Sequence, residues 1–336
     1  MPNITAKELA KKLNISATAV SMALNNKPGV STKTKNRIID AAEKYGYDFS
    51  KLTSRKNKSG SIYVLWYRSG NVITSYSPIF NELMEGIQDE CSNQGYKVNF
   101  IHHYDKIENL QIVIDELRVS DCLGLIVLGT ELEKSATEKI LTLHIPIVIL
   151  DSYFESLNCN YVLINNRQGA YIATTHLIRK IQSQPGHLKS SYPLRNFKER
   201  NDGFTQALRD NGLSPSLSII HSLSPSIDVA YSDMLEIIDS GKPLAKCYFA
   251  DNDLIAIGAI QALKARNYTV PDDIAIVGFD NISESSVIDP GLTTINIPRQ
   301  HMAKLSVKRL IDNINEASPF YSKTEVSIQL IERNSV

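Results

Sequence analysis

The sequence has few of the features that mark exported, membrane-spanning or metal-holding proteins. Among its 336 residues there are only four cysteines, Cys91, Cys122, Cys159 and Cys247, and they are widely scattered. None of the paired spacings that metal ligands require is present. We therefore expect four buried free thiols, no metal site and no cofactor.

Long apolar runs are also missing. No stretch approaches the roughly 20 apolar residues that cross a bilayer. The N-terminus turns polar after Met1 and lacks the apolar core of a signal peptide. We expect a globular, cytoplasmic protein, and at 336 residues a chain of two or three domains.

Catalytic motifs are absent as well. Gly278-Phe279-Asp280 is not followed by the glycines of a phosphate-binding loop. His102 and His103 stand at the end of an expected strand, where neighbouring side chains point to opposite faces and cannot share a metal. The chain has no Gly-x-Ser-x-Gly elbow and no evident Cys/His pairing. These absences argue against an enzyme.

Net charge is zero only as a sum, because 36 basic residues balance 36 acidic ones. Residues 1–60 hold 12 Lys or Arg and 4 Asp or Glu, a charge of +8, which leaves 24 basic and 32 acidic residues, or −8, in the remainder. A basic head on an acidic body is typical of a protein whose head binds a polyanion. A small, surface-rich domain can also carry such a charge without binding nucleic acid.

The first 49 residues predict three short helices. Thr5 and Glu8 form a capping box at the start of the first helix, and Asn14 suits its left-handed end. Ser16 caps the second helix, and Ser31 or Thr32 caps the third, which stops at Gly46. The residues expected to face inward are Ala19, Val20, Ala23 and Leu24 in the second helix and Ile38, Ile39, Ala42 and Tyr45 in the third.

Two short helices joined by a tight turn, with a third helix against them, form a helix-turn-helix. The second helix would expose small or polar side chains, Ala17, Thr18, Ser21 and Met22, as a helix entering the major groove requires. Periodicity alone would equally suit a plain three-helix bundle.

From Ile62 onward, short apolar runs alternate with amphipathic stretches. The expected strands are Ile62–Tyr67, Val98–His102, Leu123–Leu128, Ile147–Leu150, Tyr161–Ile164, Ser218–Leu223, Cys247–Ala250, Ile274–Phe279 and Val326–Ile331. Between most of them lie expected helical stretches such as Ile79–Gln94, Arg167–Arg179, Lys198–Asn211, Leu254–Arg266 and Arg299–Asn313. This alternation predicts doubly wound parallel sheets, and the number of strands favours two lobes.

Several segments carry a specific resemblance. Ile15–Asn25, Val30–Thr34 and Ala41–Tyr47 closely resemble the head of the lactose-repressor (LacI) family. In the body, Arg200–Phe204, Phe249–Ala259, Val270–Asp280 and Leu292–Ile295 resemble the same family. The resemblance implies a helix-turn-helix domain over 1–49, a hinge over 50–60, and a periplasmic-binding-protein-like body over 61–336. That body would consist of two α/β lobes with chain crossovers, and it would bind an effector and form the dimer.

The resemblance also assigns residues to DNA. Ala17, Thr18 and Met22 would face bases, and Thr5, Ser16, Ser21, Asn25, Ser31 and Thr34 would contact phosphates. Met22 departs from the family, in which Arg is commonest at this position, so an apolar surface replaces paired hydrogen bonds to guanine. In the linker, Leu52 remains but Lys56 stands where the family has its apolar wedge. We expect backbone contacts from Lys51, Arg55, Lys56 and Lys58, while a minor-groove hinge helix and a plain flexible tether both stay open.

By the same resemblance Arg200, Asn252 and Asp280 would hold the effector, with Asp151, Tyr76 and Arg195 as weaker candidates. Asp151, Asn252 and Asp280 each follow an expected strand, where ligands of open parallel sheets gather. A carboxylate, an amide and an arginine suit a sugar. Each residue also has a plainer role: Asp280 and Asn252 as caps, Arg200 as the partner of an acid.

The sequence therefore predicts a homodimeric, sugar-responsive repressor that binds a DNA operator. A corepressor-dependent or activating relative stays open, as does a solute-binding protein without a transcriptional role. The solute-binding alternative conflicts with the basic head and the missing export signal. A sugar-modifying enzyme on the same sheets would need an acid/base set that the chain does not show.

Overall fold

The computed structural model describes residues 4–24, 29–47, 60–69, 79–316 and 318–336. The chain forms two compact units and passes between them repeatedly. The first unit comprises residues 1–70, 87–161 and 303–323, and the second comprises residues 71–86, 162–302 and 324–336.

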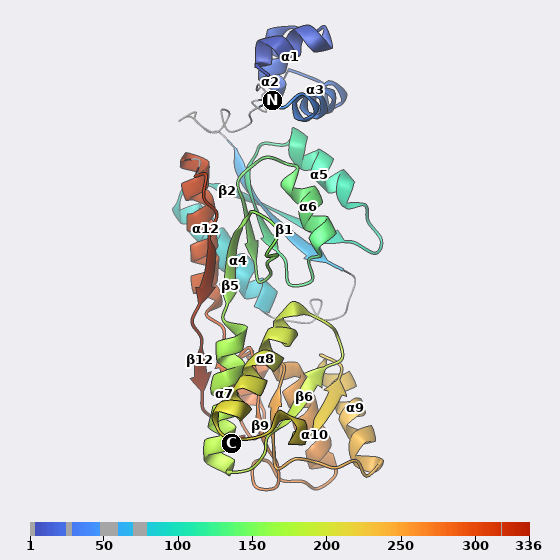
Figure 1. The fold of residues 1–336 in the computed structure, drawn as a ribbon, viewed down its shortest axis with the longest axis vertical. Helices are drawn as coiled ribbons and strands as arrows, with labels where there is room; N and C mark the ends of the chain where they lie inside the picture. Colours follow the sequence, from blue (N-terminus) through green and yellow to red (C-terminus); the bar gives the residue numbers. More distant parts are fainter. Residues whose placement is uncertain (1–3, 25–28, 48–59, 70–78, 317) are drawn as a thin grey trace. The chain divides into compact units, whose positions relative to one another are not determined.

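Three helices form the N-terminal head of the first unit (Figure 1): α1 (Ala6–Leu13), α2 (Ala17–Leu24) and α3 (Thr32–Lys44). The predicted capping box is present, because the N–H of Thr5 donates to Glu8 Oε2 at 2.7 Å and the N–H of Glu8 donates to Thr5 Oγ1 at 3.3 Å. Leu9, Val20 and Ile38 lie in one apolar core. The inward position expected for Tyr45 is wrong: α3 has ended there, and the ring is 38% exposed with Lys12 Nζ 4.0 Å from its centre.

The rest of the first unit is built on a six-stranded sheet in the order β11-β5-β4-β3-β1-β2, in which β5 and β11 each contribute residues to both units. Its strands are β1 (Ser61–Arg68), β2 (Lys97–Tyr104), β3 (Cys122–Leu128), β4 (Ile147–Leu150), β5 (Asn160–Ile164) and β11 (Lys323–Val326). β1 pairs in parallel with β2 and β3, and β3 pairs in parallel with β4. The connecting helices include α5 (Leu110–Val119) and α6 (Lys134–Leu141), while α4 (Ile79–Asn93) and α12 (Arg299–Asn315) each contribute residues to both units.

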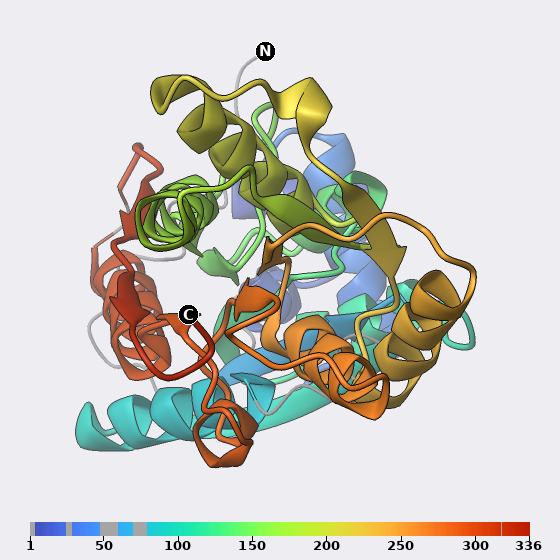
Figure 2. The ribbon, with the colours of Figure 1, turned by 90° about the horizontal axis from the view of Figure 1, so that it is seen from below.

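The second unit contains a parallel four-stranded sheet in the order β7-β6-β8-β9. Its strands are β6 (Gly186–Ser190), β7 (Ile220–Leu223), β8 (Cys247–Ala250) and β9 (Ala275–Val277). Helices α7 (Asn166–Ile181) and α8 (Arg195–Asp210) cover one face, and α9 (Ile227–Asp239) and α10 (Asp253–Ala265) cover the other (Figure 2). The remaining elements are η3 (Pro215–Leu217), α11 (Glu284–Val287) and an antiparallel ribbon of β10 (Thr294–Asn296) and β12 (Gln329–Ile331).

The predicted alternation of strands and helices is confirmed, but the short strand β10 was not expected, and there are two further differences. β6 was not expected, because Lys189 and Ser190 interrupt its apolar pattern, yet it pairs with both β7 and β8. The single strand expected over Val326–Ile331 is wrong: β11 ends at Val326 in the six-stranded sheet, and the chain then changes sheets to form β12. All four cysteines are buried and free, as expected.

Candidate functional site

The second helix of the head presents small and polar side chains to solvent. Ala17, Thr18 and Ser21 are exposed, while Val20 and Ala23 on the opposite side are buried in the head's core. Small side chains let a helix backbone approach base edges closely. The geometry of α2 therefore suits the recognition helix that the sequence predicts.

The remaining DNA candidates in the head have partners of their own. Met22 is half-buried, and its Cε lies 2.6 Å from where a Cβ on Gly29 would stand, so Gly29 gives the methionine room. Ser16 Oγ caps α2 by accepting from the N–H of Ala19 at 3.0 Å. Ser31 caps α3, and its hydroxyl lies 2.8 Å from that of Thr34. The positions expected at Asn25, Lys51, Leu52, Arg55, Lys56 and Lys58 lie outside the described residues.

In the second unit, Arg200 is the centre of a buried polar cluster. It projects from α8 and is 4% exposed. Its Nε donates to Asn166 Oδ1 at 2.9 Å, Nη1 donates to the carbonyl of Asp251, and Nη2 lies 3.3 Å from Asp280 Oδ1. The guanidinium lies over the Phe279 ring, 3.7 Å from its centre. The structure thus brings Arg200 and Asp280 together, and the acid-pairing role that the sequence left open for Arg200 is real.

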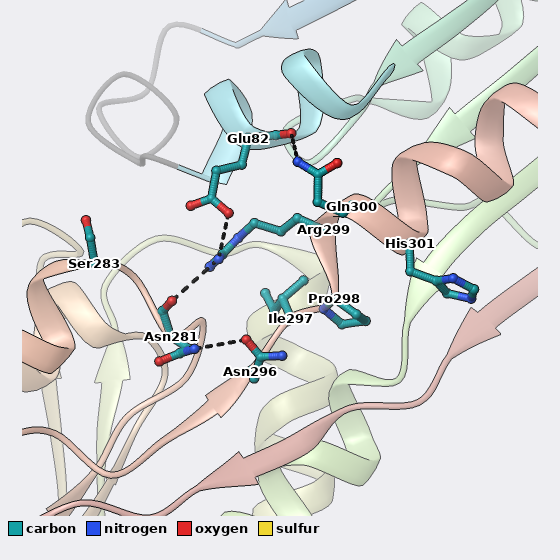
Figure 3. A pocket seen from close by; sticks show the side chains of 9 residues that line it. All are labelled: Glu82, Asn281, Ser283, Asn296, Ile297, Pro298, Arg299, Gln300 and His301. Carbon is teal, nitrogen blue, oxygen red and sulfur yellow. Dashed lines mark hydrogen bonds and ion pairs between the residues drawn. The ribbon is translucent and has the colours of Figure 1, made fainter. Parts of the chain in front are cut away.

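Asp280 stands in a strained turn three residues beyond the end of β9 at Val277. Asp280 and Asn281 both have positive φ, 117° and 51°, a backbone region that residues other than glycine seldom occupy. Arg299 holds this turn: Nη2 donates to the carbonyl of Asp280, and Nη1 lies 3.4 Å from that of Asn281 and 3.2 Å from Glu82 Oε2 (Figure 3). The Asn281 amide donates to Asn296 Oδ1 at 2.9 Å. The buried Arg299 side chain therefore stabilises the turn that carries Asp280.

A solvent-open cavity of about 530 Å³ lies beside this arginine. It is lined by Glu82, Asn281, Ser283, Asn296, Ile297, Pro298, Arg299, Gln300 and His301 (Figure 3). Arg299 donates to Glu82 and to the backbone carbonyls of Asp280 and Asn281. The side of the cavity that Arg299 forms therefore supports the Asp280 turn.

Burial raises the pKa of the Asp280 carboxyl, and the positive charges of Arg200 and Arg299 oppose that rise. Neighbouring Asp253 is fully buried, and burial raises its pKa to about 7. Its carboxylate accepts from the N–H of Ile282 at 3.0 Å and from the hydroxyls of Ser285 and Thr294 at 2.6 and 2.5 Å. Asp253 thus anchors the segment that follows Asp280.

Asn252 caps α10, because its Oδ1 accepts from the N–H of Ile255 at 2.9 Å. The cap uses the oxygen and leaves the Nδ2 group to donate elsewhere. Beside it, Asp251 accepts from the N–H of Ser190 at 2.7 Å and lies 2.8 Å from His187 Nε2, with both side chains fully buried. Sequence reasoning missed Asp251, His187 and Asp253. The run Asp251-Asn252-Asp253 after a buried strand was the signal that could have found the two aspartates.

Three other residues were effector candidates. Arg195 lies on α8 and pairs with Glu199 at 3.1 Å. Asp151 belongs to the first unit, where it follows β4 with φ 66° and accepts from Thr130 Oγ1 at 2.5 Å. Tyr76 lies outside the described residues.

Within the ranges that the structure describes, no three His, Cys, Asp or Glu side chains gather as metal ligands. In the same ranges, no helix is long and apolar enough to cross a membrane.

Comparison with known proteins decides the family. Residues 5–49 match the pattern of bacterial regulatory proteins of the lacI family, and residues 175–336 match a periplasmic binding protein-like domain. The HTH-type transcriptional repressor PurR of Aliivibrio salmonicida is 30% identical over 99% of this chain and 98% of its own length. The chain belongs to the LacI family.

Solved structures agree with this assignment. A LacI family transcriptional regulator from Enterococcus faecium with bound ribose is 25% identical, with a TM-score of 0.70 over 81% of this chain and 98% of its own. The lac repressor dimer bound to operator and an anti-inducer is 18% identical, with a TM-score of 0.69 over 99% of both chains, and shows the shared fold. The predicted fold class is confirmed, and this LacI-family chain is a DNA-binding transcriptional regulator.

Proposed function

We propose that this regulator is a cytoplasmic repressor that binds a roughly palindromic operator as a homodimer and is controlled by a sugar or sugar derivative. The repressors among its relatives and the dimeric, operator-bound lac repressor of the same fold support the first part. The ribose-bound neighbour supports a carbohydrate. We infer no enzymatic activity, because the relatives are transcriptional regulators.

The effector assignment depends on one observation, the buried Arg200–Asp280 pair. Asp280 Oδ1 lies 3.3 Å from Arg200 Nη2 but, among the described residues, accepts no hydrogen bond of good geometry. A buried carboxylate oxygen in that position is matched by a ligand hydroxyl. Asn252 directly follows Asp251, whose carbonyl accepts from Arg200, and an arginine, a carboxylate and an amide together suit neighbouring hydroxyls of a sugar. We propose Arg200, Asn252 and Asp280 as the principal effector ligands, with Asp151, Arg195 and Tyr76 as secondary ones.

For DNA, we propose that Ala17, Thr18 and Met22 face bases, because α2 leaves this side of the head open. Thr5, Ser16, Ser21, Asn25, Ser31 and Thr34 would approach phosphates, as would Lys51, Arg55, Lys56 and Lys58 from the linker, where Leu52 is a further DNA-contact candidate. Met22 cannot make paired hydrogen bonds to guanine. Met22→Arg should therefore shift the selected half-site toward guanine at one position, and Ser21→Ala should leave base preference unchanged.

Selection of bound DNA from a random pool tests the proposal. The full chain should enrich a palindromic site, and one sugar from a panel of ribose, cellobiose and phosphorylated hexoses should change that affinity about 5–150-fold. Binding without sequence preference would contradict the operator assignment. A sugar that tightens binding would make the effector a corepressor.

A thermal-shift screen of sugars, phosphosugars and nucleobases separates the effector classes. The active ligand should raise the melting temperature of the unaltered chain but not of Asp280→Asn, whereas Asp202→Asn, at an exposed position on α8, serves as the matched control. Stabilisation by nucleobases alone would overturn the sugar assignment.

A further inference from the structure

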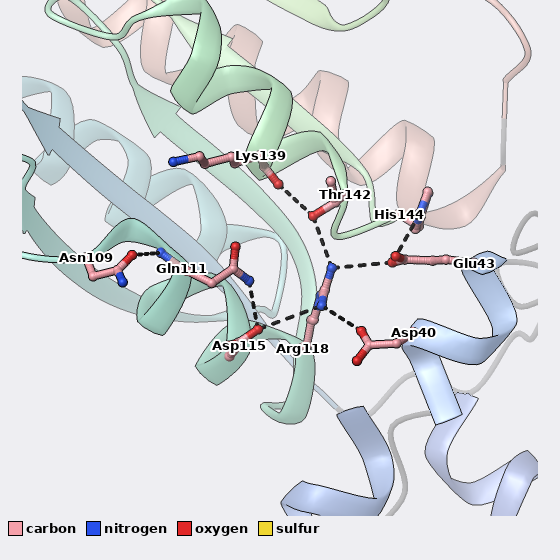
Figure 4. Close-up of polar contacts among 9 residues, drawn as sticks. All are labelled: Asp40, Glu43, Asn109, Gln111, Asp115, Arg118, Lys139, Thr142 and His144. Carbon is pink, nitrogen blue, oxygen red and sulfur yellow. Dashed lines mark hydrogen bonds and ion pairs between the residues drawn. The ribbon is translucent and has the colours of Figure 1, made fainter. Parts of the chain in front are cut away.

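The head and the body of the first unit are joined by a cluster of charged side chains around Arg118 (Figure 4). Arg118 lies at the C-terminal end of α5, and its side chain is 10% exposed. Its Nη1 lies 3.3 Å from Asp40 Oδ1, and its Nη2 lies 3.4 Å from Glu43 Oε1, both on α3 of the head. Nη2 also donates to Thr142 Oγ1, just after α6, at 3.1 Å. One buried arginine therefore bridges the head and two elements of the body.

Two further contacts extend this cluster. His144 Nε2 lies 3.5 Å from Glu43 Oε1, from a position with φ 52° in the turn after α6. Lys35 of α3 is only 5% exposed, and its Nζ donates to the carbonyl of Val119 at 3.1 Å. Burial lowers the pKa of Lys35. Since a buried ammonium costs free energy unless polar groups surround it, Lys35 marks a desolvated contact.

An isolated exposed ion pair contributes little to stability. The Arg118 cluster differs because one largely buried guanidinium contacts three carboxylates, those of Asp40, Glu43 and Asp115, and the Thr142 hydroxyl. In such an arrangement charged hydrogen bonds support one another. It also changes the electrostatics of the head. Asp40 and Glu43 are two of the four acidic side chains in residues 1–60, and a paired carboxylate repels DNA phosphates less than a solvated one.

The docked face of the head is not its proposed DNA face. Ala17, Thr18 and Ser21 of α2 are exposed while α3 contacts the body. Docking through α3 is thus compatible with reading the major groove through α2.

We propose that the α3 face of the head is a docking surface for the α5–α6 face of its own body, and that Arg118 holds the head in the orientation that binds DNA. The body then acts on the head through this contact as well as through the linker. The docking is inferred from the contacts of Arg118 and Lys35, whereas its effect on DNA binding rests on the proposed function.

Spin labels test the docking without DNA. Labels at Lys33→Cys on α3 and Glu138→Cys on α6 occupy exposed positions, and the four native cysteines are buried. Double electron–electron resonance on the full chain should give one narrow distance distribution. Arg118→Glu should broaden it, and adding Asp40→Arg and Glu43→Arg should restore the narrow peak. Lys139→Glu on α6, an equal charge reversal on an exposed side chain, should leave it unchanged.

Operator binding gives the second measurement. With the selected operator, Arg118→Glu should weaken binding at least fivefold relative to Lys139→Glu, the lower end of ordinary coupling between sites. The double reversal on α3 should restore it. A broad distribution in the unaltered chain, or one that Arg118→Glu does not change, would refute the docking surface. Lost docking with unchanged operator affinity would refute its role in DNA binding. If no form of the chain prefers a DNA sequence, the proposed function fails while the distance measurement still decides the docking.

Discussion

Replacing Arg200 with methionine removes the cation that lies 3.3 Å from the Asp280 carboxylate. Both residues are at least nine-tenths buried, with Arg200 4% and Asp280 6% exposed. At an effective dielectric constant of about 20, two unit charges at that separation attract by roughly 5 kcal/mol. Removing one partner of a buried pair typically costs about 3–5 kcal/mol. Because Arg299 still contacts the Asp280 backbone, we expect the lower end, about 3 kcal/mol.

The stability lost in Arg200→Met should depend on pH in a defined direction. Burial raises the pKa of Asp280, and Arg200 opposes that rise, so Arg200→Met raises the folded-state pKa further. A carboxyl whose pKa is raised on folding stabilises the protein at low pH, and this stability is lost as pH rises through the folded pKa. The difference in free energy of unfolding between Arg200→Met and the unaltered protein should therefore be smallest under acidic conditions and should grow as the pH rises.

Native-state hydrogen exchange of the amides of β8 measures the opening free energy of the second unit alone. The double variant Arg200→Met/Asp280→Asn removes both charges and should recover most of the loss. A cost below about 1 kcal/mol at high pH, a pH-independent cost, or a double variant as unstable as the single one would refute the reasoning, since each contradicts a buried pair.

Three further predictions concern packing, capping and thiol chemistry. Gly258→Ala should cost about 1–3 kcal/mol of stability in urea unfolding, because the new Cβ would lie 2.5 Å from the Ile227 carbonyl; Gly291→Ala, whose nearest neighbour is the flexible Arg333 side chain at 3.3 Å, is the control. Thr5→Ala should destabilise the head by about 1 kcal/mol in calorimetric melting, and the difference should shrink at acid pH, because the Thr5 hydroxyl, together with the Thr5 backbone N–H that the variant keeps, lowers the pKa of Glu8. Native protein should react with none of its thiols in Ellman's assay at mildly alkaline pH, since burial raises each cysteine pKa to about 12, and with all four after unfolding; early reaction of any one would contradict its burial.

Local sequence signals predicted most elements of this fold. The capping box, the left-handed Asn14 and the Ser16 cap depend on neighbouring residues alone, and all three are present. β6 escaped notice because its position between two strands, and not its composition, makes it a strand. The switch of the C-terminal segment from β11 to β12 likewise depends on partners far away in sequence.

In the candidate site, too, the sequence predicted some residues but not the contacts between them. Arg200 and Asp280 were found by resemblance, yet only the fold shows that they contact each other. Arg299 was missed because it acts on the backbone of Asp280 and carries no local pattern, whereas Asp253 was missed although it follows a buried strand. No sequence period brings Arg118 to Asp40 and Glu43, since 75 or more residues separate them.

The Arg118 cluster has a consequence for building hybrid regulators. The DNA-binding head of one regulator can be fused to the body of another, because one short segment joins the two. A foreign head on this body would place its own third helix against Arg118 and the Val119 carbonyl, and it would pair with them only if it carried acids at positions 40 and 43 and a lysine at position 35. A working hybrid would therefore have to carry these three side chains with it, or receive a new residue in place of Arg118.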